Sequence, residues 1–352
     1  MTDDPLAFVG TYSEPDEDGV FGFRLDDEGQ LHHTSAMTGG ADPTFLSPDS
    51  AGERLFVANR PEDEGAVIAY DVDRESGSLR RINQAPTKGN GTPCYCSLDA
   101  TDSWVLTAQY GGHTVSVLPI DDYGQVHDPV CIVEHEGSGP DEDRQAAPHP
   151  HSIRTGPDNE YAYVPDLGTD TLYVYDFDAE TGVLEPADCG HAQLQPGAGP
   201  RHLDFHPNGE WVYLINELDS TVTAFERDTE TGGLDAFETV PTLPEDFDGE
   251  NITADIHVHP SGEHLYGSNR GHDSIAVFEL DDEGRPSLVE TESTRGEWPR
   301  NFALDPSGTF LFAENADTDD IVTFRVGEDG TLDATGHVAE VPSPVCLRFL
   351  DE

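Results

Sequence analysis

Positive side chains are scarce in this chain of 352 residues. Lysine and arginine total 17 against 71 aspartate and glutamate residues, so the formal net charge is 17 − 71 = −54. Lys88 is the single lysine, and the other sixteen cations are arginines. Nucleic acids and anionic membrane surfaces are bound through dense groups of cationic side chains. We therefore expect neither a nucleic-acid nor a membrane partner.

The chain also has few cysteines and no long apolar run. Its five cysteines are an odd number, and Cys94 and Cys96 are too close in sequence for an ordinary metal site, which favours buried free thiols. No stretch approaches the roughly 18 apolar residues of a membrane-spanning helix, and the residues after Met1 form no basic or apolar leader. We expect a soluble, cytoplasmic protein.

Hydrophobic residues make up only 35% of the chain, which raises the alternative of disorder. The apolar residues nevertheless form short alternating runs, such as residues 54–59 and 171–175, separated by Gly, Pro and Asp. This pattern indicates a folded β protein with its acidic residues on the surface. Because the charge is spread evenly, we interpret the composition as halophilic, since a Debye length of about 3 Å at 1 M salt screens self-repulsion. A generally acidic cytosolic protein is the alternative.

An internal repeat organises the chain. Its units begin with a proline, and an aromatic residue follows 13 positions later, as from Pro200 to Tyr213. Six units share this spacing, although Leu106 replaces the aromatic in one and Thr253 replaces the proline in another. Each unit then continues with a second alternating run and a turn, so we expect four short strands per unit.

A seventh unit is divided between the two ends of the chain. Residues 344–349 have room for one strand, and three more strands are expected at residues 6–10, 20–25 and 31–35. This division predicts an all-β fold, a seven-bladed β-propeller of four-stranded antiparallel blades whose last blade combines N- and C-terminal strands. An array of β-sandwiches would not need a split unit. Because no linker-like stretch interrupts the composition, we expect residues 1–352 to form one domain.

Two positions of the repeat are expected to meet at one end of the central channel. One follows the opening proline, and the other lies four residues after the aromatic. Charged residues at these positions come from four consecutive blades: His151, Arg201, Glu217, Arg270 and Arg300. Guanidinium groups bind carboxylate or phosphate through paired hydrogen bonds, so arginines clustered in so acidic a chain predict an anion site. The alternative is that Arg201 and Arg270 only neutralise Glu217 and Asp166.

Other polar residues near this end are less specific. The residue three after the aromatic is polar in every unit, and we assign this position to blade architecture because such side chains satisfy turn backbone groups. His149 flanks the channel end, whereas His202 and His257 in the first strands could serve the site or the packing. No metal-site spacing, Gly-x-Ser-x-Gly elbow or glycine-rich phosphate loop occurs. We expect acid/base and electrostatic catalysis with no metal and no cofactor.

Several motifs together resemble the seven-bladed lactonase family, which includes propeller-type 6-phosphogluconolactonases and fungal carboxymuconate-lactonizing enzymes. The resemblance covers essentially the whole chain and is carried by Pro148-His-Pro-His-Ser152, Gly199-Pro-Arg-His202, Tyr213-Leu-Ile-Asn-Glu217 and Ser268-Asn-Arg-Gly-His272. By motif it implies catalytic roles for His151, Arg201, Glu217 and Arg270. We expect the substrate to contact His149, His202, His257, Arg300 and Asp166. Two departures are Asp255, where the family usually carries Glu, and an acidic insertion at 141–143.

The cluster and the resemblance predict a lactonase that acts on a sugar lactone, with 6-phosphogluconolactone or a related aldonolactone as the first candidate. Glu217 or His151 would be the general base, and an arginine would stabilise the oxyanion. The choice between the two bases stays open, because burial raises the pKa of a glutamate and adjacent arginines lower it. The alternatives are lactonization of a muconate-like dicarboxylate and a non-catalytic propeller that binds a small anion or a protein.

Overall fold

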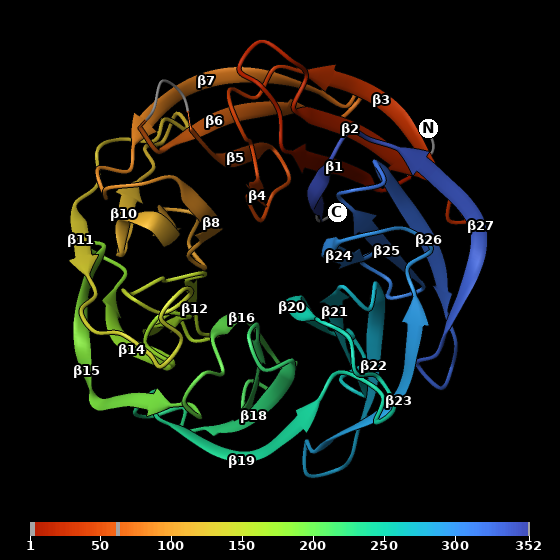
Figure 1. Ribbon diagram of the computed structural model, residues 1–352. Helices are drawn as coiled ribbons and strands as arrows, with labels where there is room; N and C mark the ends of the chain where they lie inside the picture. The colour runs from red at the N-terminus through yellow and green to blue at the C-terminus, as the bar shows by residue number, and fades with distance from the viewer. Residues whose placement is uncertain (1–3, 61–63, 351–352) are drawn as a thin grey trace.

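Seven sheets form a ring around a central axis in the computed structural model, which describes residues 4–60 and 64–350 (Figure 1). Within these residues each sheet has four antiparallel strands in a meander. The predicted seven-bladed β-propeller is therefore confirmed. In the part of the chain that is described, no helix is long and apolar enough to cross a membrane.

Each blade contributes one strand to each of four layers, counted outward from the axis. The innermost strands are β4 (Phe45–Pro48), β8 (Pro93–Leu98), β12 (Arg154–Thr155), β16 (Pro200–Phe205), β20 (Ile252–Val258), β24 (Pro299–Leu304) and β28 (Pro344–Phe349). The second strands are β1 (Leu6–Thr11), β5 (Arg54–Asn59), β9 (Trp104–Gln109), β13 (Tyr161–Asp166), β17 (Trp211–Asn216), β21 (His264–Arg270) and β25 (Phe310–Asn315). The third strands are β2 (Val20–Leu25), β6 (Ala66–Asp73), β10 (Thr114–Pro119), β14 (Thr171–Asp178), β18 (Thr221–Arg227), β22 (Ser274–Leu280) and β26 (Asp320–Val326). The outer strands are β3 (Leu31–Met37), β7 (Ser78–Pro86), β11 (Cys131–Glu134), β15 (Val183–Gln193), β19 (Leu234–Pro241), β23 (Pro286–Ser293) and β27 (Leu332–Glu340). A 3-10 turn, η2 (Tyr110–Gly112), follows β9.

One blade closes the ring by combining strands from both ends of the sequence. In it β28 pairs antiparallel with β1, with Val9 opposite Leu347. β2 and β3 complete the sheet, so the split unit forms as predicted, with β1 and β3 extending slightly beyond the predicted ranges. Because the first and last strands are hydrogen-bonded neighbours, the ring is held shut by the same ladder that holds each blade.

The aromatic residue of the repeat connects neighbouring blades. Its ring is fully buried, and where it is tyrosine its hydroxyl donates to a turn carbonyl in the next blade. The pairs are Tyr163 with Gly232 (3.0 Å), Tyr213 with Gly284 (2.9 Å) and Tyr266 with Gly330 (2.9 Å). All three glycines have positive φ, a conformation that favours glycine over other residues. The regular spacing of the repeat therefore reflects contacts between neighbouring blades as well as the strands within each blade.

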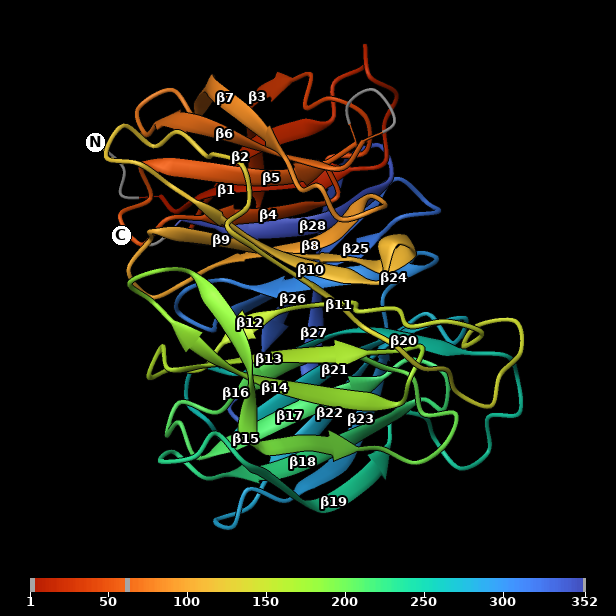
Figure 2. The same ribbon diagram turned by 90° about the vertical axis from the view of Figure 1, so that its left-hand side faces the viewer.

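Long loops project from one face of the ring. Figure 2 shows the ring from the side, with the loop around residues 136–148 and the loop around residues 243–251 on the right-hand face. This is the face at which the innermost strands begin, because each loop leads into the first strand of a blade. The loops therefore surround the end of the axis where the two predicted repeat positions should meet.

Candidate active site

The four residues predicted to be catalytic come together at the end of the axis where the innermost strands begin. His151 precedes β12, Arg201 lies in β16, Glu217 follows β17 and Arg270 ends β21. Each is buried, with an exposed fraction of 2–4%. We call these four residues the site cluster and this end of the axis the site mouth.

Glu217 is the centre of the site cluster. Its Oε2 lies 3.0 Å from Nε of Arg201 and 3.0 Å from Nη2 of Arg270, and its Oε1 lies 2.5 Å from Nη2 of Arg144. Burial would raise the pKa of Glu217, but the charges of Arg270, Arg201 and Arg144 outweigh it and lower this pKa to about 2. The carboxylate is therefore ionised, and three guanidinium groups share it.

His151 faces this carboxylate without bonding to it. Its Nε2 lies 3.9 Å from Oε2 of Glu217, beyond hydrogen-bond distance, and its Nδ1 lies 3.8 Å from Sγ of Cys94. Burial, followed by the positive charge of Arg201, lowers the pKa of His151 well below 6.5. At neutral pH the imidazole is therefore uncharged and able to accept a proton. Burial also raises the pKa of the Cys94 thiol to about 11, so this neighbour is uncharged as well.

Backbone carbonyls orient the two arginines of the site cluster. Nη1 of Arg201 donates to the carbonyl of Ala254 at 2.5 Å, and Nη2 of Arg270 donates to that of Thr253 at 2.5 Å. The Nε of Arg270 is buried and has no hydrogen-bond partner among the described residues. Burial lowers the pKa of Arg270 to about 9, so it remains charged at neutral pH. The cluster thus holds fixed N–H donors beside a neutral imidazole.

A partly exposed rim surrounds the site cluster. Arg144, in the loop after β11, has a side chain that is 37% exposed. The ring of His149 stacks on Tyr110 with centroids 4.2 Å apart. Arg300 lies over the ring of Tyr12 at 5.7 Å, and within the described residues it forms no ion pair with a carboxylate. The rim therefore offers a guanidinium group whose charge is not neutralised by an adjacent acid.

Asp166 is bonded to groups of the protein beside the site mouth, and its expected contact with substrate stays a prediction. It is completely buried and accepts hydrogen bonds from the backbone N–H groups of His149 (2.7 Å) and Gly168 (2.9 Å) and from Nδ1 of His135 (2.6 Å). It ties the loop that carries His149 to the end of β13. This is the architectural role predicted for its position in the repeat.

His202 and His257 lie on innermost strands, further along the axis than the strand ends at the site mouth. A strand advances about 3.3 Å per residue, so residues further along β16 and β20 lie deeper along the axis. Both histidines line a cavity of about 570 Å³ in the other half of the channel, together with Tyr95, Arg154 and Arg348 among others. We call it the far cavity. The ring of His202 also lies beside the site cluster, with its centroid 5.3 Å from that of His151. The expectation that these two histidines contact a substrate stays a prediction.

Sequence reasoning missed Arg144, the third partner of Glu217. It lies outside the repeat, so the spacing that aligned the blades gives it no position. The signal available was local: it is an isolated arginine directly after the acidic insertion at 141–143 and just before the Pro-His-Pro-His motif. In a chain so poor in cations, an arginine beside a site motif was a candidate on composition alone.

The alternative that the arginines only neutralise acids is partly correct. Arg201 and Arg270 do pair with Glu217, but Asp166 pairs with His135 instead. One carboxylate facing several guanidinium groups leaves positive charge in excess. Among the described residues no group of three or more His, Cys, Asp or Glu side chains could hold a metal ion, and all five cysteines are free thiols.

Known proteins are similar to this chain in both sequence and fold. Residues 6–349 match the family model described as "Lactonase, 7-bladed beta-propeller". The chain is 37% identical over 350 residues to the 6-phosphogluconolactonase of Bacillus subtilis, covering 99% of each chain. The solved structure of a Bacteroides fragilis protein has a TM-score of 0.92 and 34% identity, covering 100% of this chain and 99% of that one. The periplasmic gluconolactonase of Pseudomonas aeruginosa has a TM-score of 0.92 and 30% identity, covering 99% of each chain.

Proposed function

Because this chain belongs to the Lactonase family of seven-bladed β-propellers, we propose that it hydrolyses the ring ester of a sugar lactone, with 6-phosphogluconolactone as the first candidate. The observation that carries this proposal is the site cluster, in which an ionised glutamate lies beside a neutral histidine and is shared by Arg201, Arg270 and, from the rim, Arg144. Ester hydrolysis needs a proton acceptor for water and donors for an oxyanion, and the cluster contains both.

His151 is the general base in this mechanism. The carboxylate of Glu217 is a poor base, because the arginines that lower its pKa also occupy both of its oxygens. The neutral imidazole of His151 can take a proton from water as the water oxygen adds to the lactone carbonyl carbon. A water that directs one O–H toward Nε2 of His151 and the other toward Oε2 of Glu217 fits their 3.9 Å separation.

Arg201 and Arg270 stabilise the oxyanion. Addition of the water oxygen converts the carbonyl into a tetrahedral intermediate with negative charge on oxygen, and fixed guanidinium donors in a buried site stabilise such charge strongly. Collapse of the intermediate breaks the bond from the former carbonyl carbon to the ring oxygen, which takes the proton from His151. The product is the open-chain acid. Negative charge among these arginines also raises the pKa of His151 during the reaction, which strengthens it as a base.

Arg300 and Arg144 hold an anionic substituent of the substrate. Arg300 has no carboxylate partner in the described part of the chain, and Arg144 is exposed enough to turn from Glu217 toward a ligand. Guanidinium groups bind phosphate through paired charge-assisted hydrogen bonds. His149, next to Tyr110, would contact the sugar at the rim.

The test is the rate of 6-phosphogluconolactone loss in about molar KCl near pH 6.5, with gluconolactone as the uncharged comparison. We expect turnover of the phosphorylated lactone above the spontaneous rate, and loss of turnover in His151→Asn. His206→Gln is the matched control, because His206 bonds only turn groups at a blade edge. A folded wild type without activity on either lactone would contradict the proposal and favour the muconate-lactonizing or binding-module alternatives.

We also propose that the protein is halophilic and cytoplasmic, with residues 1–352 acting as one domain. The charge of −54 supports the first point, because repulsion among surface carboxylates is screened over about 3 Å at 1 M salt but over about 8 Å at 0.15 M. We therefore expect the melting temperature and kcat/KM to fall when KCl is reduced from about 2 M to about 0.1 M. Sucrose at equal osmolality is the control, and a salt-independent melting temperature would contradict the halophilic assignment.

A further inference from the structure

Arg201 lies between two groups along the axis: Glu217 on one side, and His202 with its partner Asp255 on the other. Toward the site mouth its Nε faces Glu217 at 3.0 Å. Toward the far cavity its Nη1 lies 3.2 Å from Nε2 and 3.3 Å from Nδ1 of His202. These nearly equal distances mean that Nη1 lies against the imidazole ring as a whole. The orientation of Arg201 therefore depends on where the His202 ring is held as well as on the carbonyl of Ala254, which accepts a hydrogen bond from the same Nη1.

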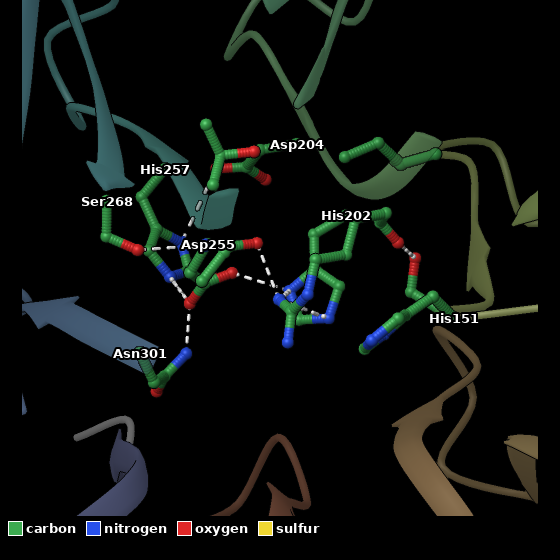
Figure 3. Close-up of polar contacts among 12 residues, drawn as sticks. His151, His202, Asp204, Asp255, His257, Ser268 and Asn301 are labelled. Carbon is green, nitrogen blue, oxygen red and sulfur yellow. Dashed lines mark hydrogen bonds and ion pairs between the residues drawn. The ribbon is translucent and has the colours of Figure 1, made fainter. Parts of the chain in front are cut away.

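The carboxylate of Asp255 holds that ring. Nδ1 of His202 lies 2.7 Å from Oδ1 of Asp255, the distance of a strong hydrogen bond from an imidazole N–H to a carboxylate (Figure 3). Burial and the charge of Arg201 keep the pKa of His202 low, at about 3, so the ring is neutral. A neutral ring is required here, because a protonated one would repel the adjacent guanidinium group. The hydrogen bond to Asp255 places the single ring proton on Nδ1.

Asp255 is itself fixed from several strands. Its Oδ2 accepts from Nε2 of His257 at 3.0 Å and from the side-chain amide of Asn301, and its backbone N–H donates to Oγ of Ser268 at 3.0 Å (Figure 3). These partners belong to β20, β24 and β21. The side chain is 3% exposed, and these bonds hold it against His202.

We propose that Asp255 and His202 are positioning residues of the active site: Asp255 fixes the ring of His202, and this ring holds the guanidinium group of Arg201 against Glu217 and toward the reacting carbonyl. The proposal rests on the proposed function, since it gives Arg201 its purpose in the reaction.

Asp204 provides the matched comparison within the same cavity. Its carboxylate lies 2.6 Å from Nη1 of Arg154 and 3.8 Å from Nδ1 of His257, so it is ion-paired much as Asp255 is. It makes no contact with His202 or Arg201 among the described residues. A network that only stabilises the propeller would respond alike to loss of either carboxylate.

The experiment compares Asp255→Asn with Asp204→Asn in lactone hydrolysis. The amide N–H group of an asparagine at position 255 would face partners that are themselves donors: His202, His257 and Asn301. The ring of His202 would then no longer be held in place, and neither would the guanidinium group of Arg201. A misplacement of about 1 Å can cost about 100-fold in rate, so we expect kcat to fall about 10- to 100-fold with KM within about threefold. Asp204→Asn should keep kcat within about twofold, and Asp255→Glu, which retains the charge, should recover most of the loss. Equal kcat in the two asparagine variants, both shown to be folded, would overturn the proposal.

A second measurement does not depend on turnover. In protein labelled with ¹⁵N-arginine, the Nε–H signal of Arg201 can be assigned by its loss in Arg201→Lys. We expect this signal to shift or broaden in Asp255→Asn and to stay in place in Asp204→Asn. An unmoved signal in Asp255→Asn would overturn the positioning role. If the wild type hydrolysed no lactone while the signal moved as expected, the proposed function would fail and the positioning of Arg201 would stand.

Discussion

The two halves of the channel contain the same kinds of residue in opposite proportions. At the site mouth, arginines outnumber the acid that they share: Arg144, Arg201, Arg270 and Arg300 surround Glu217. In the far cavity, carboxylates outnumber the cations that line it: Asp49, Asp99, Asp102, Asp204, Asp255 and Asp305 accompany Arg154, His257 and Arg348. Both halves are polar and both hold buried histidine, so polarity alone does not identify the site.

The difference teaches that a local excess of positive charge distinguishes the proposed active site from the rest of the channel. A buried cation paired with a carboxylate has its charge matched and serves the fold. Three guanidinium groups on one carboxylate, with a fourth beside them, leave charge that a negative substrate or oxyanion can match. In a molecule of charge −54, such a region is a local reversal of the overall field. The following variants test whether the two halves really differ in this way.

The largest effect is expected from His151→Asn, which keeps the size and polarity of the side chain but removes a base of imidazole strength. Loss of a general base lowers rates by about 10²- to 10⁴-fold, so we expect kcat for the lactone to fall within that range. Single-turnover rates in excess protein measure this without interference from product release. His202→Asn should lower kcat less, because His202 is proposed to act through Arg201. A larger loss in His202→Asn would indicate that His202 is the general base and His151 the positioning residue.

The next effect concerns stability and compares one carboxylate in each half. In Glu217→Gln the buried guanidinium groups of Arg201 and Arg270 and the partly exposed one of Arg144 lose their shared countercharge, which we expect to destabilise the fold by about 3–5 kcal/mol. Asp204→Asn should cost less, about 1–3 kcal/mol, because its partner Arg154 is 34% exposed and can be hydrated. Urea unfolding in about molar KCl, followed by tryptophan fluorescence, gives both values. Equal losses would mean that the charge excess at the site mouth is not real.

A smaller effect is expected on substrate affinity. Arg300→Gln removes the guanidinium group that lacks a carboxylate partner, so we expect KM for 6-phosphogluconolactone to rise about 10-fold with kcat little changed. KM for gluconolactone, which has no phosphate, should stay the same. Arg154→Gln in the far cavity is the matched control and should alter neither KM. A parallel rise for both lactones would remove Arg300 from phosphate recognition.

The repeat allowed the fold to be predicted almost completely. A proline, a turn and an aromatic at fixed spacing reflect contacts that every blade makes, such as the hydroxyl of Tyr213 on the carbonyl of Gly284. Because these contacts recur, the sequence repeats them, and the split blade follows from counting strands. The same repeat spacing predicted the site cluster, since His151 and Arg201 occupy one repeat position and Glu217 and Arg270 another.

Two kinds of feature could not be predicted: residues that lie outside the repeat, and the depth along the axis that a side chain occupies. Arg144 reaches Glu217 from a loop with no counterpart in the other blades. The spacing gives the strand and the order of His202 and His257 but not which half of the channel their rings enter. Asp166 occupies a repeat position close to the site residues, so the sequence alone allows it to bind substrate or to hold the backbone. Its hydrogen bonds show that it holds the backbone of His149 and the ring of His135.

The smallest effect concerns the pH dependence of stability and again separates the two halves. Burial would lower the pKa of His257, but Asp255 and Asp204 outweigh it and raise this pKa from 6.5 to about 9. A raised pKa in the folded state means that protonated His257 stabilises the fold below pH 6.5 and that this stabilisation is lost as the pH rises through 9. Because the ring is 23% exposed, solvent screening reduces the gain.

The difference in unfolding free energy between wild type and His257→Gln should therefore be largest near pH 6 and shrink toward pH 10. The acid limb behaves oppositely at the site mouth, where the lowered pKa of Glu217 gives stability above pH 4.5 that is lost as the pH falls through about 2. His257→Gln should leave that acid limb in place. A constant difference across pH 6 to 10 would show that His257 is uncharged and that the carboxylates of the far cavity are balanced by Arg154 and Arg348 alone.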